Sequence, residues 1–177
     1  PSPLSCPEEH CANEVVSTHE PTGCDFTGIS PVKIANHTYE GDVLVDIWGP
    51  ASDELAAPIV ISVPHGGSFK PEYIPDRETS GSSEYCPSSG CKTSKDSYTL
   101  EIADQVVAKV IQNYCKVPYI IVNRLHRSKL DANRDKNEAA QASLIAQGAW
   151  QALHEYIAQA QGHVKNNFGT TAYANGQ

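Results

Sequence analysis

A short aliphatic run that ends in a proline, a histidine and two glycines constrains this chain more than any other stretch. Residues 59–63 read Ile-Val-Ile-Ser-Val, which predicts a short β-strand buried on both faces, since no regular polar alternation is present. Pro64 has no N–H to donate to a neighbouring strand, so the strand is expected to end there. Gly66 and Gly67 then permit a sharp turn and close approach to the backbone. His65, a residue type suited to metal binding and proton transfer, is therefore expected beyond the carboxyl end of a strand, where ligands bind in open α/β sheets.

An ordinary loop histidine followed by a glycine turn is the alternative interpretation of this tripeptide, because short motifs of this kind have many false positives. The choice between the two depends on whether other polar residues gather at the same edge of the sheet. A second polar cluster occurs further along the chain and favours a site.

Length and composition limit the classes of fold and function. The chain has 177 residues, which predicts one α/β domain: an irregular arm over 1–30, a core over 31–165 and a tail over 166–177. Its net charge of -8 argues against nucleic acid, which calls for a basic face. No apolar run approaches the roughly 18 residues that a membrane span needs.

The cysteine count predicts an oxidising compartment. No Cys-x-x-Cys pair occurs, so a zinc ribbon is not indicated, and an even number fits three disulfides with the connectivity left open. Two cysteines five residues apart suggest a locally stapled loop, and three in the first 24 residues suggest an arm tied down, with the cysteine at 115 as one candidate partner. The six residues expected to form disulfides are Cys6, Cys11, Cys24, Cys86, Cys91 and Cys115.

Two further features favour a secreted protein. The chain begins at Pro1 with neither an initiator methionine nor a signal peptide, which is expected of a processed, mature form. Asn36, in Asn-His-Thr, is an acceptor for N-glycosylation and is expected to be occupied in a secreted chain.

The sheet is expected to contain an edge hairpin and a parallel pair of strands. Residues 32–39 and 42–48 flank Glu-Gly and predict an antiparallel hairpin, with the polar Asp42 and Asp46 on one face of its second strand. A strand over 119–122 follows 59–63 after an intervening helix, which predicts a right-handed βαβ unit. The fold class is therefore α/β: a mixed sheet with parallel central strands flanked by helices.

The helices and the loop between them are predicted from periodicity and composition. A helix is expected over 97–114, with Asp96 or Ser97 as its cap, and a second over 137–161. The segment 68–95 is long for a structureless loop, and its position after the histidine suggests a lid over the site.

The second polar cluster lies in the loop over 123–135, directly after the second parallel strand. Arg127, Asp131 and Arg134 are a combination suited to binding a carboxylate. An arginine binds a carboxylate through two parallel hydrogen bonds, and a neighbouring aspartate fixes the orientation of the arginine. A solvated basic loop with internal ion pairs, each worth about 0–1 kcal/mol, is the alternative. Since both loops follow parallel strands, the site interpretation places Arg127 and Arg134 beside His65.

At this point the chain resembles a known family. Val63-Pro64-His65-Gly66-Gly67, an aspartate ahead of a helix, and Arg127-Ser-Lys-Leu-Asp131-Ala-Asn133-Arg134 are similar to motifs of the N-formylglutamate amidohydrolases, which are related to zinc carboxypeptidases and aspartoacylases. The similarity covers roughly 58–165, and its most specific part is Arg-x-x-x-Asp-x-Asn-Arg. It implies a zinc-dependent amide hydrolase that acts on an N-acyl amino acid or the carboxyl end of a peptide, and the cysteines and the glycosylation acceptor indicate that this hydrolase is secreted.

The resemblance also implies roles for individual residues. His65 corresponds to the first ligand of one zinc ion and Asp96 to an acidic ligand, with Glu72 as a lower-ranked rival. Arg127 would polarise the scissile carbonyl. The substrate's α-carboxylate would be held by Asn133 and Arg134, with Asp131 orienting the arginines.

One departure from the family pattern matters. The family continues into a core strand ending in Asp-x-His, which would begin near Gln177, so this chain offers two of the three ligands that a catalytic zinc needs. We therefore expect a second polypeptide or a homo-oligomer partner to complete the site. A non-catalytic secreted binding or structural protein derived from this fold is the alternative, and an accidental resemblance in a disulfide-rich module is another.

Overall fold

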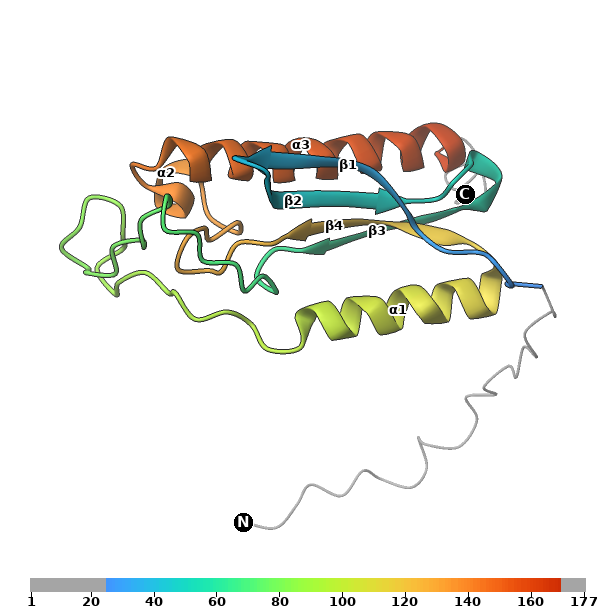
Figure 1. Cartoon of the computed structure of the whole chain (residues 1–177), viewed down its shortest axis with the longest axis horizontal. Coiled ribbons are helices and arrows are strands. Elements are labelled where there is room, and N and C mark those ends of the chain that lie inside the picture. The colour runs from blue at the N-terminus through green and yellow to red at the C-terminus, as the bar shows by residue number, and fades with distance from the viewer. Residues whose placement is uncertain (1–24, 170–177) are drawn as a thin grey trace, which may run out of the picture.

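The four strands found among residues 25–169, the part of the chain that the computed structural model describes, form one mixed sheet (Figure 1). Its order is β1-β2-β4-β3; β1/β2 and β2/β4 are antiparallel pairs, whereas β3 and β4 are parallel. The α/β class and the parallel pair are thus confirmed. In chain order the strands are β1 (Val32–Tyr39), β2 (Asp42–Gly49), β3 (Ala56–Val63) and β4 (Val117–Asn123), and the α-helices are α1 (Thr99–Tyr114), α2 (Lys136–Ala140) and α3 (Leu144–Phe168).

Two helices cover opposite faces of the sheet. The 25-residue helix α3 packs across all four strands, whereas α1 lies on the other face, against β3 and β4 (Figure 1). The larger core lies on the α3 side and includes Ile47, Ile121 and Leu153, each at most 1% exposed. A smaller cluster on the α1 side is centred on Val63 and Val122. The sheet is therefore a rigid layer whose parallel strands both end on the side where the loops gather.

Strand β3 differs from the prediction in two respects. It begins at Ala56 rather than at position 59, and it is an outer strand of the sheet rather than a central one buried on both faces. Ile59 is 36% exposed and Ser62 is exposed as well. A run of aliphatic residues indicates that a strand packs against apolar neighbours. The run does not indicate whether that strand pairs with one neighbouring strand or with two.

The hairpin is confirmed, with one difference in its second strand. β1 and β2 pair antiparallel at one end of the sheet, but β2 also pairs with β4. Asp46, expected on a polar face, is 1% exposed. Its carboxylate is covered by Lys33 at 3.0 Å and by Arg124 at 2.5 Å, two long side chains that reach over it from β1 and from the end of β4.

Helix α1 begins two residues later than predicted. Neither Asp96 nor Ser97 caps it: the residue before the helix is Tyr98, in the left-handed conformation with φ 64°, and no side chain caps the first turn. Local capping preference is overridden here because the carboxylate of Asp96 contacts His65 instead, at 3.1 Å.

The predicted second helix is in fact two helices. Gln141 breaks it, with φ 50°, and its buried side chain exchanges two hydrogen bonds with the backbone of Glu78 in the long loop. Ser143 then caps α3 by accepting a hydrogen bond from the N–H of Ala146. The break therefore fastens the loop over 68–95 to the helical layer.

The disulfide between Cys86 and Cys91 is confirmed, and Cys115 is also disulfide-bonded. The predictions for Cys6, Cys11 and Cys24 lie outside the described residues. Within residues 25–169, no helix has both the length and the apolar character required to cross a membrane.

Candidate functional site

The loops after β3 and β4 are held side by side at the carboxyl end of the parallel pair. Asn123, the fully buried last residue of β4, donates a hydrogen bond to the carbonyl of Pro64 at 2.8 Å. Phe69 bridges to Leu125 in parallel fashion and so extends the pairing beyond the strands. At Gly67 a Cβ atom would lie 2.3 Å from the backbone of Arg124, so only glycine allows this approach.

Four side chains from three loops form a closed ring of contacts, which we call the four-residue network. His65 follows β3, Asp96 precedes α1, and Arg127 and Asp131 follow β4. His65 contacts Asp131 through Nε2 at 2.6 Å and Asp96 through Nδ1 at 3.1 Å. Arg127 closes the ring, donating from Nε to Asp131 at 3.0 Å and from Nη1 to Asp96 at 3.4 Å. The predicted meeting of the two loops therefore occurs, with aspartates between the histidine and the arginine.

Burial differs across the network. Asp131 is 1% exposed and His65 is 3% exposed, whereas half of the Asp96 side chain is exposed. The network thus has a closed end, at Asp131, and an open end, at Asp96. A ligand from solvent would meet Asp96 first, and behind it lie the Nδ1 side of His65 and the side chain of Arg127.

The buried end carries a strongly stabilised negative charge. Burial by itself raises the pKa of Asp131, but the hydrogen bonds from His65 and Arg127, together with their charges, outweigh burial and lower the pKa to about 2. Asp131 therefore holds the Nε2 side of His65 as a fixed carboxylate over the whole neutral and mildly acidic range.

Sequence reasoning missed Arg77, which anchors the long loop to the site. Its guanidinium, 1% exposed, donates twice to the carbonyl of Glu138 and once each to the carbonyls of Lys92 and Arg127, and lies 3.9 Å from Asp131. Burial lowers its pKa from the ordinary value. Nothing in the local pattern distinguishes this arginine, because its partners are carbonyl groups from α2, from the loop after β4 and from a distant part of its own loop.

The remaining predicted residues lie at the rim or apart from the network. Arg134 has a half-exposed side chain whose Nε lies 3.3 Å from Glu138 and 4.0 Å from Asp131, so it borders the network from the solvent side. Asn133 is exposed, as is Glu72, the rival ligand. Asp131 lies near both arginines, with its carboxylate 3.0 Å from Nε of Arg127 and 4.0 Å from Nε of Arg134.

The donor set fits part of a zinc site. Two ligands about 2.1 Å from a tetrahedral zinc ion lie about 3.4 Å from each other, and Nδ1 of His65 lies 3.1 Å from Asp96. A metal-bound histidine usually donates its other ring N–H to a carboxylate, and Asp131 is placed to accept that bond. No group of three or more His, Cys, Asp or Glu side chains in the described part of the chain is arranged to hold a metal ion, so a third ligand is lacking there.

Acid titration tests the electrostatics of the buried end. The folded state binds a proton at Asp131 more weakly than the unfolded state does. The contribution of the Asp131 carboxylate to the free energy of unfolding is therefore complete above the unfolded pKa, 3.8, and is lost as pH falls through about 2. We expect the free energy of unfolding, from urea titrations at successive pH values, to fall by about 2 kcal/mol over this interval. Asp131→Asn is the reference; an equal acid dependence in the variant would contradict this assignment.

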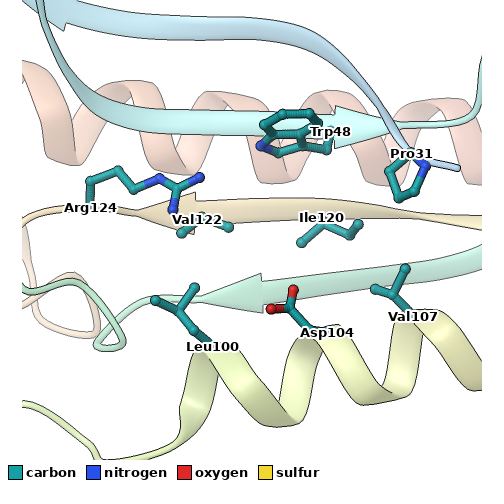
Figure 2. Close-up of a pocket in the computed structure, with 8 residues that line it drawn as sticks. All are labelled: Pro31, Trp48, Leu100, Asp104, Val107, Ile120, Val122 and Arg124. Carbon is teal, nitrogen blue, oxygen red and sulfur yellow. The ribbon is translucent and has the colours of Figure 1, made fainter.

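A separate hollow lies on the α1 face of the sheet, between α1 and the strands β2 and β4 (Figure 2). It measures about 470 Å³, and its floor is mainly apolar, with Trp48, Ile120 and Val122 from two strands. Arg124, at its rim, is paired with Asp46. None of the network residues lines this hollow, so it is distinct from the site described above.

Comparison with known proteins adds no relative: no protein-family model, no curated protein and no solved structure matches this chain.

Proposed function

We propose that the chain is a secreted, zinc-dependent hydrolase of amide bonds, with an N-acyl amino acid or the carboxyl end of a peptide as its substrate class. The observation that carries this proposal is the closed ring in which His65 lies between a buried and an exposed aspartate while one arginine spans both. A purely structural ion pair would need only the buried contacts of Asp131 with His65 and Arg127. The exposed half leaves a histidine nitrogen, a carboxylate and an arginine available to a ligand.

The metal would be held by Nδ1 of His65 and by Asp96, with a third ligand supplied from outside the described residues by a second polypeptide. When bound, zinc supplies a polarised carbonyl and a water molecule whose pKa is lowered to about 7. Asp131 holds the imidazole in the orientation that directs Nδ1 outward.

Arg127 would act on the substrate carbonyl. Its Nε and Nη1 are fixed by the two aspartates, and within residues 25–169 no hydrogen bond is made by Nη2. A guanidinium fixed in this way needs no reorganisation when an oxyanion develops, which is the condition for strong electrostatic stabilisation. Its side chain is 11% exposed, so the interaction takes place in a partly desolvated environment.

Arg134 would bind the substrate's carboxylate. It lies on the same loop, its side chain is 47% exposed, and its contacts to Asp131 and Glu138 restrict it to the rim of the network. The planar guanidinium group of arginine forms bidentate hydrogen bonds to carboxylates. Asn133, adjacent and exposed, would add an amide donor.

Hydrolysis of N-acyl amino acids by the oxidised full chain, with and without added zinc, tests the proposal. We expect zinc-dependent release of the free amine, and a loss of at least about 100-fold in kcat/KM in Arg127→Ala, the size of effect seen when one oxyanion donor is removed. Arg134→Ala should mainly raise KM. Arg124→Ala is the matched control: this partly exposed arginine pairs with Asp46 outside the network, and activity per folded molecule should not change.

Absence of hydrolysis over a panel of N-acyl amino acids, together with absence of zinc binding by calorimetry, would contradict the proposal. That result would favour the second candidate, a non-catalytic secreted protein. The observation in its favour is the burial of Asp131, 1% exposed between His65 and Arg127, which is also what a purely structural link between the two loops requires.

A further inference from the structure

The two outermost strands of the sheet differ in how their free edges are protected. β1 carries Lys33 and shifts register twice along its pairing with β2, and lysines and bulges are devices that prevent an edge from pairing with another chain. β3 reads Ala-Ala-Pro-Ile-Val-Ile-Ser-Val and contains no charged residue. Pro58 and a register shift between Ala56 and Val60, in the pairing of β3 with β4, are its protective devices. Among residues 25–169, no strand pairs with its outer edge.

Apolar hollows flank this edge on both faces of the sheet. One lies between β3 and α1, where Ile61 and Val63 meet Ile102 and Val106. The other measures about 480 Å³ and lies between β3 and α3, with Val60 as part of its lining. A strand added to β3 would therefore need apolar side chains on both faces.

Helix α1 has a second apolar stripe beside the same edge. Ile102, Val106 and Tyr114, at intervals of four and eight residues, are 57%, 44% and 66% exposed and line a further shallow hollow. They adjoin the stripe that packs on the sheet, whose Val110 lines the same hollow, so the apolar surface of α1 is wider than the part that the sheet covers. The residues of the covered stripe are Ala103, Val107, Val110 and Ile111.

We propose that this surface, formed by the outer edge of β3, the second stripe of α1 and the hollow beside α3, binds a second copy of the chain. β3 itself is the kind of strand that the edge requires: uncharged, β-branched and apolar on both faces. Two β3 strands paired antiparallel across a twofold axis continue the sheet from one copy into the other. The same axis brings α1 against α1 on one face and α3 against α3 on the other.

The size of the surface suits a stable dimer. Eight residues of strand extend about 26 Å, and helix, sheet and helix layers spaced about 10 Å apart give a thickness of about 25–30 Å. Their product is about 700 Å² for each copy, close to the roughly 800 Å² per partner of a standard specific interface.

The charge on this surface also permits self-association. The chain carries a net charge of -8, which opposes contact between copies over most of the surface. The linings of the three hollows include Lys109 and Lys165 but no aspartate or glutamate. Repulsion between carboxylates is therefore absent within these hollows.

This inference is independent of the proposed hydrolysis. Antiparallel β3 strands point their carboxyl ends in opposite directions, so neither copy reaches His65 of the other. Failure of the dimer would leave the four-residue network unchanged, and failure of hydrolysis would leave the β3 edge unchanged.

Light scattering during size-exclusion chromatography of the full chain tests the dimer. We expect twice the chain mass of 19.1 kDa at about 10–100 µM. A buried unpaired carboxylate is strongly unfavourable, so Ile59→Asp and Ile102→Asp should each raise the dimer dissociation constant at least about 100-fold. Ile34→Asp, on the outer strand β1, and Leu144→Asp, at the start of α3, are matched controls with exposed side chains and should leave the dimer intact.

Circular dichroism shows whether each variant is folded. If Ile102→Asp does not fold, Ile102→Gln is measured in its place. The inference is overturned by a mass of 19.1 kDa over the whole concentration range. It is equally overturned by a dimer that Ile59→Asp and Ile102→Asp leave intact, or by one that Ile34→Asp dissociates.

Discussion

Asp131→Ala is expected to lower the free energy of unfolding by about 3–5 kcal/mol, the usual effect of removing one partner from a buried ion pair. Asp131 is 1% exposed and contacts His65 at 2.6 Å and Arg127 at 3.0 Å, with Arg77 at 3.9 Å. Removal of its carboxylate takes away the carboxylate that lies 3.9 Å from Arg77 and leaves Arg127 with only its longer contact to Asp96, at 3.4 Å, although both guanidinium groups have little access to solvent.

Urea unfolding at neutral pH measures this effect, and two further variants separate its causes. Asp131→Asn keeps the shape and one acceptor, so a smaller loss than in the alanine variant would show how much of the effect is charge. Asp104→Ala is the matched control, because Asp104 is exposed on α1 and its removal should change stability by less than about 0.5 kcal/mol. A loss below about 1 kcal/mol in Asp131→Ala would show that the buried network does not hold the two loops.

Local patterns in the sequence were sufficient for the elements that depend on neighbours along the chain. The hairpin has a glycine turn and alternating residues, so its bounds were predicted to within one residue. The βαβ unit has a helical period between two aliphatic runs, and the parallel pairing that such a connection predicts is confirmed. The meeting of the loops after β3 and β4 follows in turn, because parallel strands end on the same side.

What the sequence could not provide depends on partners far along the chain. Asp96 before a helix has the pattern of a cap, and only the fold shows that His65, 31 residues away, takes its carboxylate instead. Arg77 lies in a polar loop where arginines are usually exposed, yet carbonyl groups from three segments bury it. Gln141 has no helix-breaking character of its own and breaks the helix because Glu78 pairs with its side chain.

The site residues illustrate the same division. The spacing of Arg127 and Asp131, four residues apart, made their ion pair a reasonable expectation. The spacing could not show that the aspartate lies between the arginine and His65. That arrangement makes Asp131 the residue on which both the imidazole and the guanidinium depend, and it explains why the expected loss is larger than for any surface pair.

Gly67→Ala is expected to destabilise the fold by about 3 kcal/mol or more, because the added Cβ would lie 2.3 Å from the carbonyl carbon and oxygen of Arg124 and 2.5 Å from the carbonyl oxygen of Leu125. These are backbone atoms held by the bridge between Phe69 and Leu125, so no flexible side chain can give way. The loops after β3 and β4 must separate to admit one methyl group. Since His65 lies two residues away, the same movement should weaken its contact with Asp131.

Gly162→Ala is the matched control, with the opposite expected sign. Gly162 lies within α3 with no atom within 4 Å of an added Cβ, so alanine should stabilise the helix by about 0.5–1 kcal/mol. Thermal unfolding of both variants measures the difference, and zinc binding by calorimetry reports on His65. If Gly67→Ala is as stable as the unmodified chain, the loops are not in contact at this point, and the ring that joins His65 to Arg127 through Asp131 loses its structural basis.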